Sequence, residues 1–121
     1  MQFLLMCCFD EGRWNAIPEG ERTELMQAYG GWIDRLTQSG HYLGGGKLEG
    51  SATAASVTVR NGKPAITDGP FAETKEQLGG YHLLECRDRE EALALAAAIP
   101  TLPAGGKVEV RPMHHVIPGA R

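Results

Sequence analysis

The residues of this chain that could do chemistry are few, and the first is an aspartate in a turn-forming sequence. Asp68 precedes Gly69 and Pro70, and its carboxylate could act as a general acid or base or could orient a ligand. The alternative is an Asx-type turn onto the backbone, which the residue chemistry alone favours. Phe71 follows directly and could stack on an aromatic ligand, although a phenylalanine after a turn is more often a core anchor.

Two further side chains could take part in proton transfer or carboxylate binding. His82 lies in an alternating segment, and its imidazole, with an unperturbed pKa of about 6.5, could carry a proton if its sheet face lines a cavity. A hydrogen-bonded structural histidine is the favoured alternative. Arg111 could bind the carboxylate of a ligand, but Glu109 shares its strand face, so a structural pair between them is favoured.

Metal, thiol and cofactor chemistry are not indicated. His114 and His115 are adjacent, so on an extended segment they point apart and cannot readily share a metal ion. The three cysteines are an odd number on predicted buried strands, where thiols usually behave as small hydrophobes. The triple glycine 44–46 lacks the Lys-Ser/Thr pair of a phosphate loop. We therefore expect no metal ion, no cofactor, and a reducing, cytoplasmic location.

Composition favours one soluble domain spanning residues 1–121. The chain has 121 residues, of which 42% are hydrophobic and 22% charged, as in ordinary globular domains. A net charge of −3 supplies no basic field for phosphates, so nucleic acid is not expected as a direct ligand. The apolar run 3–9 is far shorter than the ~18 residues of a spanning helix, so no membrane association is expected either.

The first half of the chain predicts a strand, a helix and a hairpin. The run 3–9 is apolar on both faces and reads as a strand, and 10–18 reads as a polar loop. Apolar residues with helical spacing predict a helix from Pro18 to the stop at Gly40. An extended segment follows, and Asn61-Gly62 predicts a two-residue turn between strands 57–60 and 63–66.

The second half predicts a loop, a strand, a helix and a last strand. Turn residues and charges between 67 and 80 predict a loop, and 81–86 reads as a strand. Asp88 with Glu91 three residues later is typical of a helix start. The clean alternation of 107–112 predicts the final strand.

This element order predicts an antiparallel sheet with two helices on one face. The first strand nevertheless carries apolar side chains on both faces, and a bare apolar sheet face exceeds what soluble monomers usually expose. No third helix is predicted to cover it. We therefore expect a homodimer in which a second copy covers that face by a two-fold contact.

The segment 68–81, DGPFAETKEQLGGY, resembles the signature of the DGPF branch of the YCII-related proteins. The resemblance continues through the aromatic first strand, the helix into Gly40, the glycine run and the last strand, and so covers essentially the whole chain. It implies an α+β fold of the ferredoxin-like βαββαβ kind with an extra β-hairpin, paired into a dimeric α/β barrel. Members of this branch resemble accessory proteins that are encoded beside, or fused to, extracytoplasmic-function sigma factors. The resemblance therefore implies a protein partner linked to such a sigma factor.

The wider YCII-related group resembles small enzymes with a proposed dyad of a helix histidine and an aspartate ahead of the Pro-Phe motif. Asp68 matches the aspartate, whereas Tyr29 stands where the histidine would be. A phenol with an unperturbed pKa of about 10 is a poor base at neutral pH, so acid-base chemistry needs a shifted Tyr29 or another partner.

Three hypotheses follow for function. The first is a cofactor-independent enzyme that binds or transforms a small molecule in a cavity near Asp68, Tyr29 and Phe71, with Asp68 as acid-base residue and Tyr29, His82 or Arg111 positioning substrate. The second is a non-catalytic regulatory or interaction module. The third is a degenerate relative that keeps the fold and has lost the chemistry. Fold-level analogy does not separate them.

Overall fold

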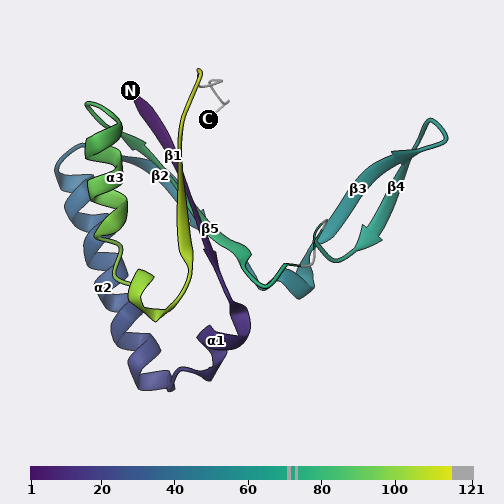
Figure 1. Cartoon of the computed structure of the whole chain (residues 1–121), viewed down its shortest axis with the longest axis horizontal. Helices are drawn as coiled ribbons and strands as arrows, with labels where there is room; N and C mark the ends of the chain where they lie inside the picture. The colour runs from purple at the N-terminus through teal and green to yellow at the C-terminus, as the bar shows by residue number, and fades with distance from the viewer. Residues whose placement is uncertain (71, 73, 116–121) are drawn as a thin grey trace.

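The computed structural model describes residues 1–70, 72 and 74–115, and shows one antiparallel sheet with helices against one face and a hairpin that extends away from it (Figure 1). The sheet has the order β2-β5-β1-β6. This is the strand order of the split βαβ, ferredoxin-like arrangement. Its strands are β1 (Gln2–Phe9), β2 (Tyr42–Lys47), β5 (Gln77–Glu85) and β6 (Lys107–Pro112).

Two longer helices form where the sequence places them. α2 (Glu19–Gln38) starts after Pro18 with acids in its first turn, and Gly40 follows its end with φ +81°. α3 (Arg89–Ala97) is capped by Asp88, whose carboxylate accepts a hydrogen bond from the Glu91 backbone N–H at 2.9 Å. Two short 3-10 turns are also present, at Ser51–Thr53 and Leu102–Ala104.

A short helix, α1 (Glu11–Ala16), corrects the prediction of a loop over residues 10–18. Asp10 accepts a hydrogen bond from the backbone N–H of Arg13 at 3.2 Å and so caps the first turn. Glu11 adds a distant contact, because its carboxylate accepts hydrogen bonds from the backbone and side chain of Ser51. The helix therefore depends on a cap and a tertiary contact that an apolar repeat does not reveal.

The core lies between the sheet and the helices. Phe3, Leu5 and Leu84 are fully buried on the helix-facing side of the sheet. The Trp32 indole packs against them from α2 and donates a hydrogen bond to the Leu95 carbonyl of α3 at 3.0 Å. This side of the sheet is therefore closed by a mixed aliphatic and aromatic layer.

The opposite side of the sheet has no covering element from the described part of the chain. Leu4 and Met6 alternate with the buried residues of β1 and pair in register with Leu83 and Tyr81 of β5. These side chains are half-buried or exposed, and Tyr81 is 41% exposed. For simplicity we call this surface, Leu4, Met6, Tyr81 and Leu83, the open face.

The hairpin joins β3 (Ala55–Arg60) to β4 (Lys63–Asp68) as a separate two-stranded sheet. Its turn has the positive φ angles that Asn61-Gly62 favours, 52° and 76°. Three of its apolar side chains are largely exposed, namely Val57, Val59 and Ile66 at 68%, 72% and 74%.

The fifth strand begins four residues earlier than the alternation predicts, at Gln77 instead of Tyr81. Pairing with β1 extends the strand through Gly79 and Gly80, which have no side chains and therefore show no alternation of apolar and polar residues. A Cβ atom on Gly79 would overlap the Phe9 ring, so the glycine lets β5 pass that ring closely.

Candidate functional site

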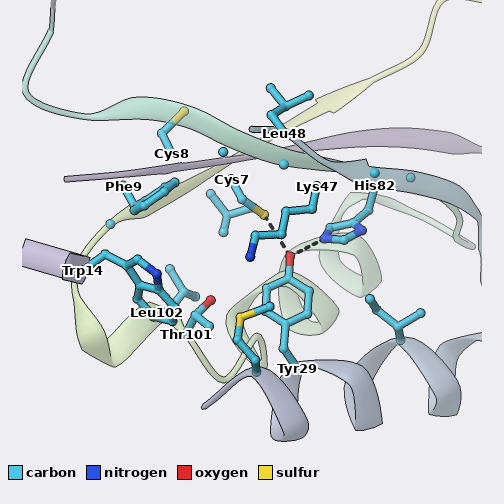
Figure 2. Close-up of a pocket in the computed structure, with 18 of the residues that line it drawn as sticks. Cys7, Cys8, Phe9, Trp14, Tyr29, Lys47, Leu48, His82, Thr101 and Leu102 are labelled. Carbon is cyan, nitrogen blue, oxygen red and sulfur yellow. Dashed lines mark hydrogen bonds between the residues drawn. The ribbon is translucent and has the colours of Figure 1, made fainter. Parts of the chain in front are cut away.

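A cavity of about 360 Å³ lies between the helix-facing side of the sheet and helices α1 and α2 (Figure 2). Its walls are mostly apolar and aromatic, as in small-molecule sites, and its volume is at the lower end of the range for such sites. Phe9 and Trp14 form one wall and contact each other edge to face, with ring centroids 6.3 Å apart. The cavity therefore fits a molecule about the size of one substituted ring.

Three polar side chains meet at one wall of the cavity. His82 of β5 is only 4% exposed and bonds a tyrosine through each ring nitrogen. Its Nε2 lies within hydrogen-bond reach of the Tyr29 hydroxyl from α2, and its Nδ1 lies 2.7 Å from the Tyr42 hydroxyl of β2. The Tyr29 hydroxyl is also 3.5 Å from the Cys7 sulfur of β1, as Figure 2 shows. Four segments far apart in sequence therefore converge on one hydrogen-bonded chain.

Burial keeps this chain of groups uncharged at neutral pH. It lowers the pKa of His82 to about 4, because desolvation penalises the imidazolium. Burial is likewise the largest cause that raises the pKa values of Tyr29, Tyr42 and Cys7 above their ordinary ranges. A neutral imidazole has one donor and one acceptor nitrogen, so one tyrosine donates to His82 and the other accepts from it. The three rings thus form a neutral donor-acceptor relay.

Packing fixes the orientation of the relay. The Trp32 ring contacts all three relay rings at steep angles, and its centroid lies 5.1 Å from that of His82. The triple glycine of β2 supplies the remaining space, because a Cβ atom on Gly45 would overlap the Tyr81 backbone carbonyl oxygen and the Tyr42 hydroxyl and would lie 2.9 Å from His82 Nδ1. Gly45 therefore allows the hydrogen bond between Tyr42 and His82 to form.

The charged side chains among the described residues that line the cavity are all positive. They include Lys47 and Lys107 but no aspartate or glutamate. Lys107 forms an ion pair with Glu76, at 3.4 Å. The Lys47 amino group has no hydrogen-bond or ion-pair partner within the described part of the chain.

The structure brings together two of the residues singled out from the sequence, Tyr29 and His82. The resemblance places Tyr29 where a helix histidine would stand, and an imidazole does contact that position, although β5 supplies it. His82 is also the hydrogen-bonded, buried histidine of the alternative interpretation. The role of His82 as a proton carrier stays a prediction.

The remaining candidates do not join this cavity in the described chain. Asp68 is exposed at the end of β4, where it pairs in register with Ala55, so the expectation of a cavity near Asp68 is corrected. Arg111 is 71% exposed and contacts Glu109 at 2.6 Å on the sheet face opposite the helices, which is the structural pair that the sequence favours. Phe71 lies outside the described residues.

Sequence reasoning missed Tyr42, Lys47 and Trp32 as members of the site. The available signal was the glycine run next to Tyr42, because glycines inside a strand often mark a close approach by another group. Nothing in the local pattern, however, indicates which group approaches.

Replacing Gly45 by alanine tests whether the glycine makes room for the relay. We expect Gly45→Ala to break the bond between Tyr42 and His82 and to lower the free energy of unfolding by about 1–3 kcal/mol, the range for overpacking. Gly44→Ala is the matched control, since a Cβ atom there meets nothing within 4 Å. Urea unfolding measures both, and equal effects would contradict this role of Gly45.

The buried imidazole also predicts a pH dependence of stability. The folded pKa of about 4 lies below the ordinary value of 6.5, so between these pH values the unfolded chain binds more protons. Stability from this group is therefore complete above pH 6.5 and falls by roughly 3 kcal/mol as the pH drops to 4. Urea unfolding at several pH values should give a shallower loss for His82→Gln, which cannot titrate. Parallel profiles would disprove the shift.

Comparisons with known proteins agree with this architecture. The sequence profile described as a YCII-related domain matches residues 1–115. An uncharacterized protein of Rhizobium meliloti (strain 1021) is 35% identical over 126 residues, which cover 98% of this chain and 97% of that protein.

A solved structure with a similar fold is 5-chloro-2-hydroxyhydroquinone dehydrochlorinase from Burkholderia phenoliruptrix AC1100 in complex with 2,5-dihydroxybenzoquinone. Its TM-score is 0.57, with 15% identity over 96% of each chain, which shows likeness of fold alone. None of the described helices is long and apolar enough to cross a membrane. On the profile match and the Rhizobium relative, the chain belongs to the YCII-related domain family.

Proposed function

We propose that this protein binds a small, flat organic molecule in the cavity and moves a proton on it through Tyr29 and His82, without a cofactor. The observation that carries the proposal is the relay of Tyr29, His82 and Tyr42 at the wall of a cavity of about 360 Å³. Aromatic walls suit a ring, and a hydroxyl or carbonyl oxygen of that ring can bond the Tyr29 hydroxyl.

The neutral state of the relay limits the chemistry it can perform. A charged imidazolium is disfavoured at this site, since burial lowers the pKa of His82 to about 4. Storing a proton on His82 is therefore unfavourable, whereas passing one proton in while another passes out leaves the relay neutral. Such an exchange suits a tautomerisation, in which one atom of the bound molecule loses a proton and another gains one.

The dehydrochlorinase with the similar fold supports a ring compound as the ligand class. Its bound molecule is 2,5-dihydroxybenzoquinone, a single ring with hydroxyl and carbonyl oxygens. The proposal assigns no part to Asp68, Phe71 or Arg111. Asp68 and Arg111 are exposed and do not line this cavity. An acid-base role for Asp68 would need a second copy of the chain to bring it to the cavity.

We also propose that the chain belongs to the DGPF branch of the family, and the signature at residues 68–75 supports this. A non-catalytic regulatory or interaction module is the second candidate function. The exposed side chains of Val57, Val59 and Ile66 favour it, because apolar residues gathered on one hairpin suit a protein partner. This candidate does not account for the relay at the cavity. The proposal of a partner linked to a sigma factor is supported by the resemblance to the DGPF branch alone.

Removing one hydroxyl tests the proposed chemistry. Resorcinol, a 1,3-dihydroxybenzene, takes up deuterium at ring carbons through its keto tautomer, and NMR in D2O follows that exchange. We expect the protein to accelerate the exchange and the Tyr29→Phe variant to slow it at least tenfold. General acid-base groups typically contribute roughly 10²–10⁴-fold to a rate. Tyr81→Phe, on the open face, is the matched control and should behave as wild type.

The outcomes separate binding from proton transfer. Chemical-shift changes at the cavity residues without accelerated exchange would leave a binding protein and contradict the catalytic half. No shift changes with resorcinol or with 2,5-dihydroxybenzoquinone would contradict the proposal as a whole.

We further propose that the chain forms a homodimer through the open face, in line with a dimeric α/β barrel. Leu4, Met6 and Leu83 lie on this face, and association would remove their exposed area from water. Sedimentation at micromolar concentration should give twice the 13.1 kDa chain mass.

A charge on the open face should separate the two copies. Leu4 pairs in register with Arg111, so Leu4→Glu places its carboxylate beside a guanidinium and spares the fold. We expect this variant to sediment as a folded monomer. Leu93→Glu, at a 39% exposed position on α3, should remain dimeric. A wild-type monomer, or a dimer unaffected by Leu4→Glu, would contradict this interface.

A further inference from the structure

The rim of the cavity carries a cation whose charge is not neutralised by a described neighbour. Lys47 is the last residue of β2 and lines the cavity, and Figure 2 shows its amino nitrogen directed into it. The described residues that line the cavity include no carboxylate. Lys107, the other cation of the wall, has Glu76 as its partner. Lys47 is therefore the group most able to attract a negative charge to this site.

A second hollow adjoins the cavity at the same lysine. It has a volume of about 500 Å³ and shares Trp14, Met26 and Lys47 with the cavity. Arg22 also lines it, and its Nε atom is buried with no hydrogen-bond partner among the described residues. Glu19 is the acid of this hollow, so the lining combines two cations with one anion. The rim between the two hollows thus has a positive balance.

The part of the cavity beside the relay cannot hold a charge as well as Lys47 can. The relay groups there are neutral, and the burial that keeps them neutral would also penalise an anion placed against them. A bound anion is therefore best stabilised at the rim, beside Lys47. An uncharged hydroxyl or carbonyl oxygen is best placed at the relay, beside Tyr29.

From this division of charge we infer that the ligand is an aromatic carboxylate, with its ring in the cavity, its carboxylate at Lys47 and an oxygen substituent at Tyr29. The inference rests on the proposed function and narrows it to one substrate class. Arg22 flanks the carboxylate from the adjoining hollow and adds to the positive potential. A hydroxybenzoate has both groups on one ring.

Two probes of the same shape test the inference. 4-Hydroxybenzoate carries a carboxylate, and 4-hydroxybenzamide replaces it with a neutral amide. Calorimetric titration should show about tenfold tighter binding of the benzoate, the effect of one charge-assisted hydrogen bond. The preference should weaken as salt is added, because the lysine is at the rim and screened.

Variants of Lys47 show whether this residue causes the preference. Lys47→Met keeps the length of the side chain and should abolish the preference, whereas Lys47→Arg should keep it. Lys63→Met, at the start of β4 on the hairpin, removes a distant exposed charge and should leave the preference unchanged. Circular dichroism checks that each variant is folded.

The result distinguishes this inference from the proposed function. Equal binding of the two probes to wild type would overturn the carboxylate inference and leave a neutral ring compound as ligand. A preference that survives Lys47→Met would overturn the placement of the carboxylate at Lys47. Binding of neither probe would overturn the inference, and failure of resorcinol and 2,5-dihydroxybenzoquinone as well would remove the proposed function.

Discussion

The hydrogen bonding of one buried imidazole determines how this site is built. His82 lies among aromatic rings and is removed from water, so each of its ring nitrogens needs a partner within the protein. Tyr29 and Tyr42 provide those partners from a helix and from a neighbouring strand. Losing either hydroxyl would leave a buried nitrogen unsatisfied, so the relay ties the helix to the sheet as well as to the cavity.

This requirement explains backbone features that otherwise look like weaknesses. A strand with three consecutive glycines has poor intrinsic stability, yet Gly45 leaves the space in which Tyr42 reaches His82. The glycines of β5 have a similar function, because Gly79 lets the strand pass the Phe9 ring that closes one cavity wall. The glycines thus lower the strand propensity of β2 and β5, but they let neighbouring groups pack closely against the backbone around the cavity.

The same site combines neutral relay groups with a cation. Desolvation keeps His82 uncharged, whereas Lys47 is an exposed residue. The ligand that we infer matches both, with an uncharged oxygen for the relay and an anionic group for Lys47. The fold shared with the Burkholderia dehydrochlorinase supplies the scaffold, and these side chains supply the selectivity that we propose.

Short-range patterns determined much of the fold. The stop of α2 at Gly40, the Asp88 cap of α3, the turn at Asn61-Gly62 and the bounds of β6 each follow from neighbouring residues, and the structure contains all of them. Local chemistry decides these features, because a glycine in the left-handed region or a capping carboxylate acts within four residues. The sequence also marked His82 and Tyr29 as candidates for a site.

Only the tertiary structure decided how the candidates meet. Asp68 carries the most recognisable motif, yet it lies on an exposed hairpin, whereas Tyr42 and Lys47 have no motif and line the cavity. Their positions follow from the register of β2 on β5 and from the packing of α2 across the sheet. Register is set by contacts between segments far apart in the chain, so residue types and local spacing cannot specify it.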